Sequence, residues 1–244
     1  MTPPERDEAL VRHLEAQAGD LAAARRFFWH RARSRFVLDA LRRLAGARPT
    51  VLDVGAGAGV FGDHFRARFP EGSYAFDEPI EALAAGLRAR FGPSADRTGR
   101  AAQDADAALL LDVLEHQADD GAFLDALRKR LRPGALLVVT APALQVLWSD
   151  WDARHGHYRR YDRRSLSTVL SAAGFDVLRC RYLFPSLILP ALWRKVRPAA
   201  GPEFPVLSAP LNELLLQLSR LESACFGWLP FGTSVAAVAR VTAP

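Results

Sequence analysis

The stretch Val51-Leu52-Asp53-Val54-Gly55-Ala56-Gly57-Ala58-Gly59 joins a short apolar run to a turn with three glycines, and a helical pattern follows at 60–68. Glycines that come directly after a strand permit positive φ angles, and they let a ligand approach the backbone with no Cβ in the way. The N-terminus of the next helix offers N–H groups that have no partner inside the helix. This stretch therefore predicts a strand–turn–helix unit that binds a ligand.

Short apolar runs alternate with helical patterns from Thr50 onward, which is typical of βαβ units and a mainly parallel, doubly wound α/β sheet. The predicted strands are Val51–Val54, Ser73–Phe76, Ala107–Leu111, Ala135–Thr140, Phe175–Tyr182 and Thr233–Val241. The predicted helices between them are Val60–Arg68, Pro79–Arg90, Asp119–Leu131 and Arg164–Ala173. The segment 91–106 is polar and poor in β-branched residues, so the strand that such a sheet would place there is short or missing.

Further helical patterns precede the sheet and interrupt it before the last strand. Apolar residues at three- and four-residue spacing over 7–45 predict two helices divided at Gly19-Asp20, with Asp20 as an N-cap. We expect a single domain over 1–244, in four parts. These are a helical preface at 1–48, a cofactor-binding core at 49–182, a helical insertion at 183–232 and a final strand at 233–244.

Composition narrows the class of protein. The 244 residues are 50% hydrophobic and 24% charged, as in ordinary globular domains. The net charge of +5 comes from arginines spread through every region, which is not the concentrated basic face of a nucleic-acid binder. The two cysteines, Cys180 and Cys225, form no CxxC motif or His/Cys cluster, so we expect a reduced cytoplasmic setting and no bound metal.

The choice of ligand depends on the register of the glycines and on Asp53. Gly57–Gly62 matches the dinucleotide pattern G-x-G-x-x-G, but from Gly55, which directly follows the strand, the pattern fails because Val60 replaces the third glycine. A carboxylate at the strand end repels a pyrophosphate and attracts a cation. S-adenosylmethionine carries two positive charges, an ammonium and a sulfonium.

The pattern D-x-G-x-G-x-G resembles the first motif of the class I S-adenosylmethionine-dependent methyltransferases. The resemblance implies a Rossmann-like methyltransferase fold, S-adenosylmethionine as cofactor and S-adenosylhomocysteine as product. It assigns cofactor binding in this turn to Asp53, Gly55, Ala56, Gly57 and Gly59.

Three further segments continue this resemblance in the same order along the chain. The family has an acidic residue at the end of the next strand for the ribose hydroxyls, and Asp77 matches it. The segment 109–116 is similar to the family's fourth strand and the turn after it, which implies cofactor contacts from Asp112 and Val113, and 131–134 is similar to a later helix-to-strand turn. An adenine-contacting acid would fall in 91–106, where neither Asp96 nor Asp104 can be assigned.

The segment His155-Gly156-His157-Tyr158-Arg159-Arg160-Tyr161 resembles the G-H-x-R-R-Y signature of a bacterial methyltransferase subgroup that is often linked with envelope or glycolipid biosynthesis. With the strand-end position of His116 and an aromatic, arginine-containing stretch at 27–33, it supplies the candidates for chemistry. The predicted catalytic residues are His157, His116 and Tyr161, and the predicted acceptor-binding residues are Trp29, Arg33, Tyr158 and Arg160. A structural alternative is that the arginines pair with Asp152 or Asp162 while the tyrosines pack at the edge of the core.

The resulting hypothesis is methyl transfer by in-line displacement to a small-molecule, glycan or lipid-linked acceptor. The apolar stretch 183–197 ends in basic residues, so peripheral contact with the inner face of a membrane is part of the hypothesis, although the stretch is too short to span one. The rival functions are an NAD(P)-dependent oxidoreductase and a non-catalytic methyltransferase-like scaffold. A nucleic-acid acceptor is disfavoured, since 112–115 lacks the Pro-Pro-aromatic turn used for base amino groups. The sequence does not predict an oligomeric state.

Overall fold

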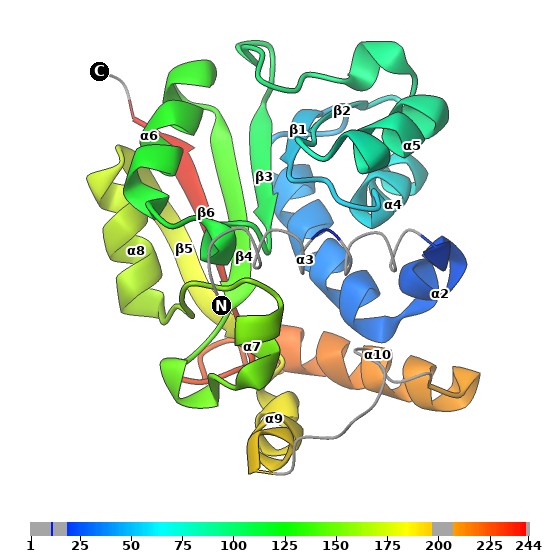
Figure 1. The fold of residues 1–244 in the computed structure, drawn as a ribbon, viewed down its shortest axis with the longest axis vertical. Helices are drawn as coiled ribbons and strands as arrows, with labels where there is room; N and C mark the ends of the chain where they lie inside the picture. The colour runs from blue at the N-terminus through cyan, green and yellow to red at the C-terminus, as the bar shows by residue number, and fades with distance from the viewer. Residues whose placement is uncertain (1–10, 12–18, 197–206, 243–244) are drawn as a thin grey trace.

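A six-stranded sheet forms the centre of the structure, a computed structural model that describes residue 11 and residues 19–196 and 207–242. Its strand order is β2-β1-β3-β4-β6-β5 (Figure 1). The strands are β1 (Thr50–Val54), β2 (Ser73–Asp77), β3 (Ala107–Leu111), β4 (Leu136–Pro142), β5 (Phe175–Leu183) and β6 (Ser234–Val241). The first four run parallel, and β6 runs antiparallel to both of its neighbours. The predicted mainly parallel α/β fold is confirmed.

Helices cover both faces of the sheet. On one face lie α6 (Asp120–Arg130) and α8 (Arg163–Ala172), and on the other lie α3 (Phe28–Leu44), α4 (Val60–Arg68) and α5 (Glu81–Phe91). Each face of the sheet has its own hydrophobic core, and successive residues of β3 point into different cores. Leu110 packs with α6 and α8, whereas Leu109 packs with α3, α4 and α5. Both leucines are fully buried.

The segment after α5 leaves β2 at the edge of the sheet. Here the 3₁₀-helix η1 (Pro93–Ala95) is followed by one isolated parallel bridge between Phe76 and Asp96, with Arg97 N donating to Phe76 O at 2.8 Å. The chain then turns away through the polar residues that follow. This confirms that the strand expected in 91–106 is absent as a strand of the sheet, because the segment supplies few side chains able to pack against β2.

The helical preface begins, within the described residues, with α2 (Leu21–Arg26). Asp20 is its N-cap as predicted, with its side chain accepting a hydrogen bond from Ala23 N at 3.0 Å. Phe27 adopts an extended conformation, with ψ of 126°, and separates α2 from α3, a break that the sequence pattern did not indicate. The predicted helical residues at 7–18 lie outside the described residues apart from residue 11.

The predicted helical insertion lies between β5 and β6. It contains α9 (Ile188–Val196) and α10 (Ala209–Cys225), and α10 packs along α3 (Figure 1). The Asn212 side chain of α10 bonds to both sides of the break at Phe27. Its Oδ1 accepts from Phe28 N and its Nδ2 donates to Arg26 O, each at 2.7 Å. Across 19–196 and 207–242 no helix has the length and apolar character needed to cross a membrane.

Candidate active site

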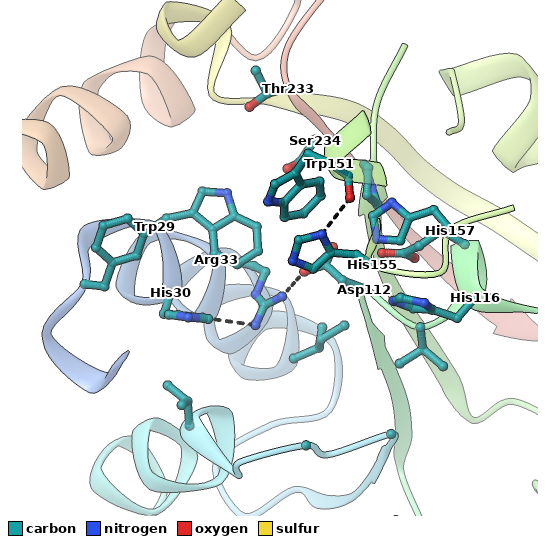
Figure 2. A pocket seen from close by; sticks show the side chains of 18 of the residues that line it. Trp29, His30, Arg33, Asp112, His116, Trp151, His155, His157, Thr233 and Ser234 are labelled. Atoms are coloured by element: carbon teal, nitrogen blue, oxygen red, sulfur yellow. Dashed lines mark hydrogen bonds and ion pairs between the residues drawn. The ribbon is translucent and has the colours of Figure 1, made fainter. Parts of the chain in front are cut away.

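A cavity of about 700 Å³ opens at the carboxyl ends of β1, β3 and β4, and residues of α3 and α9 also line it. Figure 2 shows side chains of α3 facing those of the 151–157 segment across it. The predicted cofactor residues that line the cavity are Asp53, Gly55, Ala56, Gly57, Asp112 and Val113. The predicted acceptor-side residues that line it are Trp29, Arg33, His116, His157 and Arg160. Ligands of open α/β sheets bind at this edge.

The glycine turn has the backbone that its sequence requires. Gly55, Gly57 and Gly59 have φ angles of +69°, +54° and +70°. A Cβ on Gly55 would also lie 2.7 Å from Val113 Cγ2, so the turn packs directly against the end of β3. Gly59 does not line the cavity. It is the N-cap of α4, and a Cβ here would lie 2.5 Å from Leu87 Cδ2, so its role is to pack the turn against α5.

Asp53 is a buried carboxyl at the edge of the cavity. The Tyr74 hydroxyl donates to its Oδ2 at 2.7 Å. Burial raises the pKa of Asp53 to about 7, an effect opposed in part by the Tyr74 hydrogen bond and the charge of Arg33. A carboxyl with this pKa gains from a cation placed beside it, because the cation compensates the charge that burial disfavours.

The two consecutive acids at the end of β2, Asp77 and Glu78, have different surroundings. Asp77, predicted to bind ribose, does not line the cavity and instead forms an ion pair with Arg130 Nη2 at 2.6 Å. Glu78 lines the cavity, where its carboxylate accepts from Gly57 N at 2.8 Å and Ile80 N at 2.9 Å. Burial raises the pKa of Glu78, and these two hydrogen bonds oppose that rise. Of these two acids only Glu78 lines the cavity, since side chains alternate in direction along and just beyond a strand.

Contacts among Trp29, Arg33 and Asp112 connect α3 to the end of β3 across the cavity. The Arg33 guanidinium lies 4.5 Å from the ring centre of Trp29 and forms an ion pair with the Asp112 carboxylate. Asp112 also accepts from the Thr140 hydroxyl at 3.3 Å, and its backbone has a φ of +61°, which is uncommon for a non-glycine residue. The two predicted acceptor-binding residues of α3 thus contact each other, and Arg33 also contacts Asp112 after the end of β3.

The end of the cavity that holds the predicted acceptor-side residues His116, His157 and Arg160, here called the acceptor end, is supported by the buried carboxylate of Asp152. This carboxylate pairs with His157 Nδ1 at 2.9 Å and with Arg160 Nε at 2.8 Å. Burial acts to raise the pKa of Asp152, but the bonds from His157 and Arg160 outweigh it and the net pKa is lowered. An ionised carboxylate can only accept, so His157 Nδ1 carries the proton and the lone pair of the neutral ring lies on Nε2. Burial lowers the pKa of His157, which keeps the ring neutral near pH 7.

The two tyrosines of the segment do not reach the cavity. The Tyr161 hydroxyl donates to Asp120 Oδ2 at 2.7 Å, and the ring belongs to the core beside α6 and α8. Burial, followed by the Asp120 contact, raises the pKa of Tyr161. The catalytic role predicted for Tyr161 and the acceptor contact predicted for Tyr158 are therefore not supported by position. Arg159 also forms an ion pair, but with Asp120 at 2.8 Å rather than with the predicted Asp152 or Asp162, whereas Arg160 pairs with Asp152 as the structural alternative predicted.

Sequence reasoning missed several residues of the acceptor end. Glu115 is fully buried and lines the cavity beside His116, although it lies within the quoted 109–116 segment. Burial raises its pKa well above the ordinary value, and the charge of Asp112 adds to this. Trp151 and His155 line the cavity as a stacked pair with ring centres 4.0 Å apart. Neither Asp96 nor Asp104 lines it.

The strand order, the glycine turn after β1 and the cavity at the strand ends define a Rossmann-like methyltransferase fold. Residues 28–179 match a family model described as a methyltransferase domain. Because this match covers more than half of the chain, the protein belongs to that methyltransferase domain family. No curated protein sequence gives a significant match to the chain.

Solved structures support the same fold. A Burkholderia thailandensis 1,6-didemethyltoxoflavin-N1-methyltransferase, crystallised with 1,6-didemethyltoxoflavin and S-adenosylhomocysteine, is 18% identical with a TM-score of 0.60, covering 100% of this chain and 92% of its own. A chain from the complex of a Haloferax volcanii methyltransferase activator with a candidate methyltransferase is 16% identical with a TM-score of 0.62, covering 96% and 98%. An S-adenosylmethionine-dependent methyltransferase from Archaeoglobus fulgidus is 15% identical with a TM-score of 0.51, covering 85% and 94%.

Proposed function

We propose that this protein is an S-adenosylmethionine-dependent methyltransferase that acts on a small-molecule, glycan or lipid-linked acceptor. The observation that carries the proposal is Asp53, a buried acid at the end of β1, beside a turn in which glycine is required at Gly55. The donor set of this end of the cavity fits the cofactor. Asp53 can bind a cationic group, Glu78 can accept hydrogen bonds from hydroxyls, and the glycine turn leaves its backbone accessible. All of them line one cavity.

The cofactor, when bound, supplies a methyl group activated by the sulfonium. Asp53 would hold the cationic amino-acid part, and Glu78 would accept from the ribose hydroxyls with the lone pairs that its two backbone bonds leave. Trp29 and Arg33 would cover the cofactor end and exclude water from it. These residues mainly position the reactants, which is the main requirement of an in-line displacement.

At the other end of the cavity, His116 and His157 remain the proposed catalytic residues. His157 offers a neutral imidazole whose orientation Asp152 controls, so it could accept a proton from an acceptor hydroxyl or amine. Arg160 lines the same end, but its charge is already balanced by Asp152. Arg159 and Arg160 are both paired with aspartates, so an anionic group of the acceptor would meet little net positive charge here.

Among the proposed acceptors, the arrangement of α9 favours a lipid-linked one. Pro190, Ala191 and Arg194 of this helix line the cavity. Leu189, on the same helix, is 76% exposed, and Trp193 and Val196 are also exposed. One helix thus borders the acceptor end and presents apolar side chains outward, which suits an acceptor drawn from the inner face of a membrane.

Calorimetric titration with S-adenosylhomocysteine tests the cofactor assignment, with Asp53→Asn as the variant and Asp104→Asn as a control on an acid away from the cavity. Binding by the wild type and the control, weakened in Asp53→Asn, is the expected result. Absence of binding in folded wild-type protein contradicts the proposal, and binding of NADH in its place would support the oxidoreductase. Transfer of label from radioactive S-adenosylmethionine to a lipid or aqueous extract then separates an enzyme from a scaffold.

A further inference from the structure

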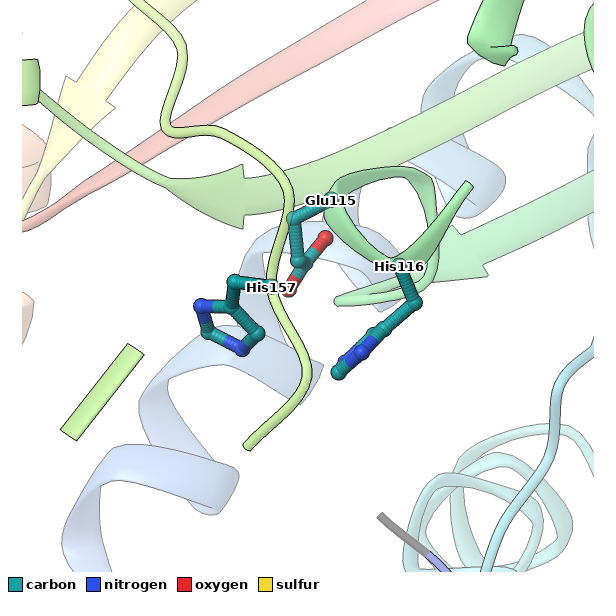
Figure 3. A group of neighbouring side chains, drawn as sticks. All are labelled: Glu115, His116 and His157. Atoms are coloured by element: carbon teal, nitrogen blue, oxygen red, sulfur yellow. The ribbon is translucent and has the colours of Figure 1, made fainter. Parts of the chain in front are cut away.

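Three potential metal ligands meet at the acceptor end of the cavity: Glu115, His116 and His157. Their ligand atoms lie within 4.8 Å of one another. Glu115 and His116 come from the 3₁₀-helix η2 (Leu114–His116) after β3, and His157 comes from the segment that follows α7 (Asp150–Arg154) (Figure 3). The two segments are joined through Tyr158 N, which donates to Glu115 O at 2.8 Å. The grouping is thus part of the backbone arrangement rather than a chance meeting of surface side chains.

Glu115 is the anomalous member of the group. Its side chain is fully buried, yet within the described part of the chain neither carboxyl oxygen has a hydrogen-bond partner. The other buried acids in and next to the cavity wall differ. Asp53 accepts from Tyr74, and Glu78 accepts from Gly57 N and Ile80 N. Asp152 accepts from Ser149 N and pairs with His157 and Arg160. A buried acid without partners is costly, and buried charges in proteins are normally paired or coordinate a metal.

We propose that Glu115, His116 and His157 bind a divalent transition-metal ion in the wall of the cavity. A carboxylate and two imidazoles form a donor set that suits Zn²⁺, Co²⁺ or Fe²⁺, whereas Mg²⁺ and Ca²⁺ prefer oxygen ligands alone. A tetrahedral ion about 2.1 Å from each ligand atom holds these atoms about 3.4 Å apart. Binding therefore draws the three side chains inward from the separations seen here.

Asp152 supplies the outer support that such a site requires. It accepts from His157 Nδ1, which leaves Nε2 as the ligand atom. Metal-binding histidines almost always donate their other N–H to a carboxylate, carbonyl or water, which orients the ring and increases its basicity. Asp152 is itself held by Arg160 and by Ser149 N, so its position is determined independently of the ion.

The site extends the proposed function, and its role in catalysis rests on that proposal. Three protein ligands leave coordination positions open, and all three residues line the cavity. A bound ion there would coordinate an acceptor oxygen and lower the pKa of a hydroxyl to be methylated. It would do so in place of proton acceptance by His157, because the ion takes the lone pair on Nε2. The acceptor atom that receives the methyl group would then be a hydroxyl oxygen. An acceptor with a second oxygen next to that hydroxyl would bind the ion more tightly, because both oxygens could coordinate it.

The first experiment titrates ZnCl₂ into the full-length protein after removal of metal with a chelator. We expect one equivalent to bind, with Glu115→Gln and His157→Gln each weakening the affinity by at least about 100-fold and Asp152→Asn by about 10- to 100-fold. His155→Gln is the matched control, because His155 also lines the cavity but is outside the group. Binding that is not stoichiometric, or a loss in His155→Gln equal to the others, overturns the proposal.

A second measurement on the wild type avoids reliance on variants that could misfold. The visible spectrum of the Co²⁺-substituted protein should show the bands of a four- or five-coordinate nitrogen and oxygen site without the strong absorption of cobalt–thiolate bonds. A thiolate spectrum would place the ion at Cys180 or Cys225 and reject the site. Titration of the same samples with S-adenosylhomocysteine keeps the two hypotheses separate, since Glu115→Gln should lose Zn²⁺ and retain that ligand.

Discussion

The two ends of the cavity are built in different ways. The cofactor end is built on one short run, Asp53 to Ala58, with Glu78 and Asp112 added from the ends of the two neighbouring strands. The acceptor end combines η2, the 151–160 segment and α9, which are far apart in the chain. The first is specified by backbone geometry and tolerates little change. The second depends on side chains held by one another, so it can vary while the fold is kept.

The largest effect is expected at the glycine turn. Gly55→Ala places a Cβ 2.7 Å from Val113 Cγ2 at a φ of +69°. We expect a loss of about 3 kcal/mol in the free energy of unfolding. S-adenosylhomocysteine binding should weaken by about 100-fold. Gly99→Ala is the matched control, because its φ is +68° with no atom within 4 Å, so it should cost only about 1 kcal/mol. Equal losses in the two variants would remove close packing from the explanation.

A smaller effect is expected from the charge of Asp53, measured as the pH dependence of binding. With a pKa of about 7, this carboxyl is mostly ionised at pH 8 and mostly neutral at pH 6. The affinity for S-adenosylhomocysteine should therefore fall about tenfold from pH 8 to pH 6, and Asp53→Asn should flatten this dependence. The sign for folding is opposite. The folded chain retains a proton that the unfolded chain releases above about pH 4, so stability falls as pH rises from about 4 to 7.

The proposed binding of the ribose hydroxyls by Glu78 rather than Asp77 predicts a fivefold change in the affinity for S-adenosylhomocysteine. Glu78→Gln should weaken S-adenosylhomocysteine binding by about fivefold, equivalent to one hydrogen bond. Asp77→Asn should leave the affinity unchanged and lower the melting temperature, because it removes the charged partner of Arg130. Calorimetry and thermal unfolding on both variants decide between them. The reverse outcome would restore Asp77 as the ribose ligand.

The smallest effect concerns the outer face of α9. Leu189→Ser should reduce partitioning onto anionic lipid vesicles by about threefold, because an exposed apolar side chain is removed. Leu178→Ser, at an exposed leucine of β5, is the control and should leave partitioning unchanged. Sedimentation with vesicles measures both. No partitioning by the wild type would instead favour an acceptor taken from solution.

The glycine turn and the position of Asp53 at the cavity were largely predictable from sequence, because a strand, three glycines and an acid at fixed spacing require one local backbone. The absence of a sheet strand in 91–106 was also predictable, because this segment has few residues that could pack against β2. The choice of Glu78 over Asp77 was not, because it depends on which face each side chain takes at the strand end. Tyr161 and Glu115 were harder still. Their neighbours, Asp120 and His157, are about 40 residues away in each case, and only the packed fold brings them together.

The two hydrogen bonds made by the Asn212 side chain, called the clasp below, limit how fast the helices that border the cavity can separate. A single amide group satisfies the last carbonyl of α2 and the first N–H of α3, so the two helices and α10 are linked through one side chain. Release of that amide frees two backbone groups at once. The amide hydrogen of Phe28 should therefore exchange with solvent at the rate at which the clasp opens, and Asn212→Ala should speed that exchange while leaving the exchange of β3 amides unaltered.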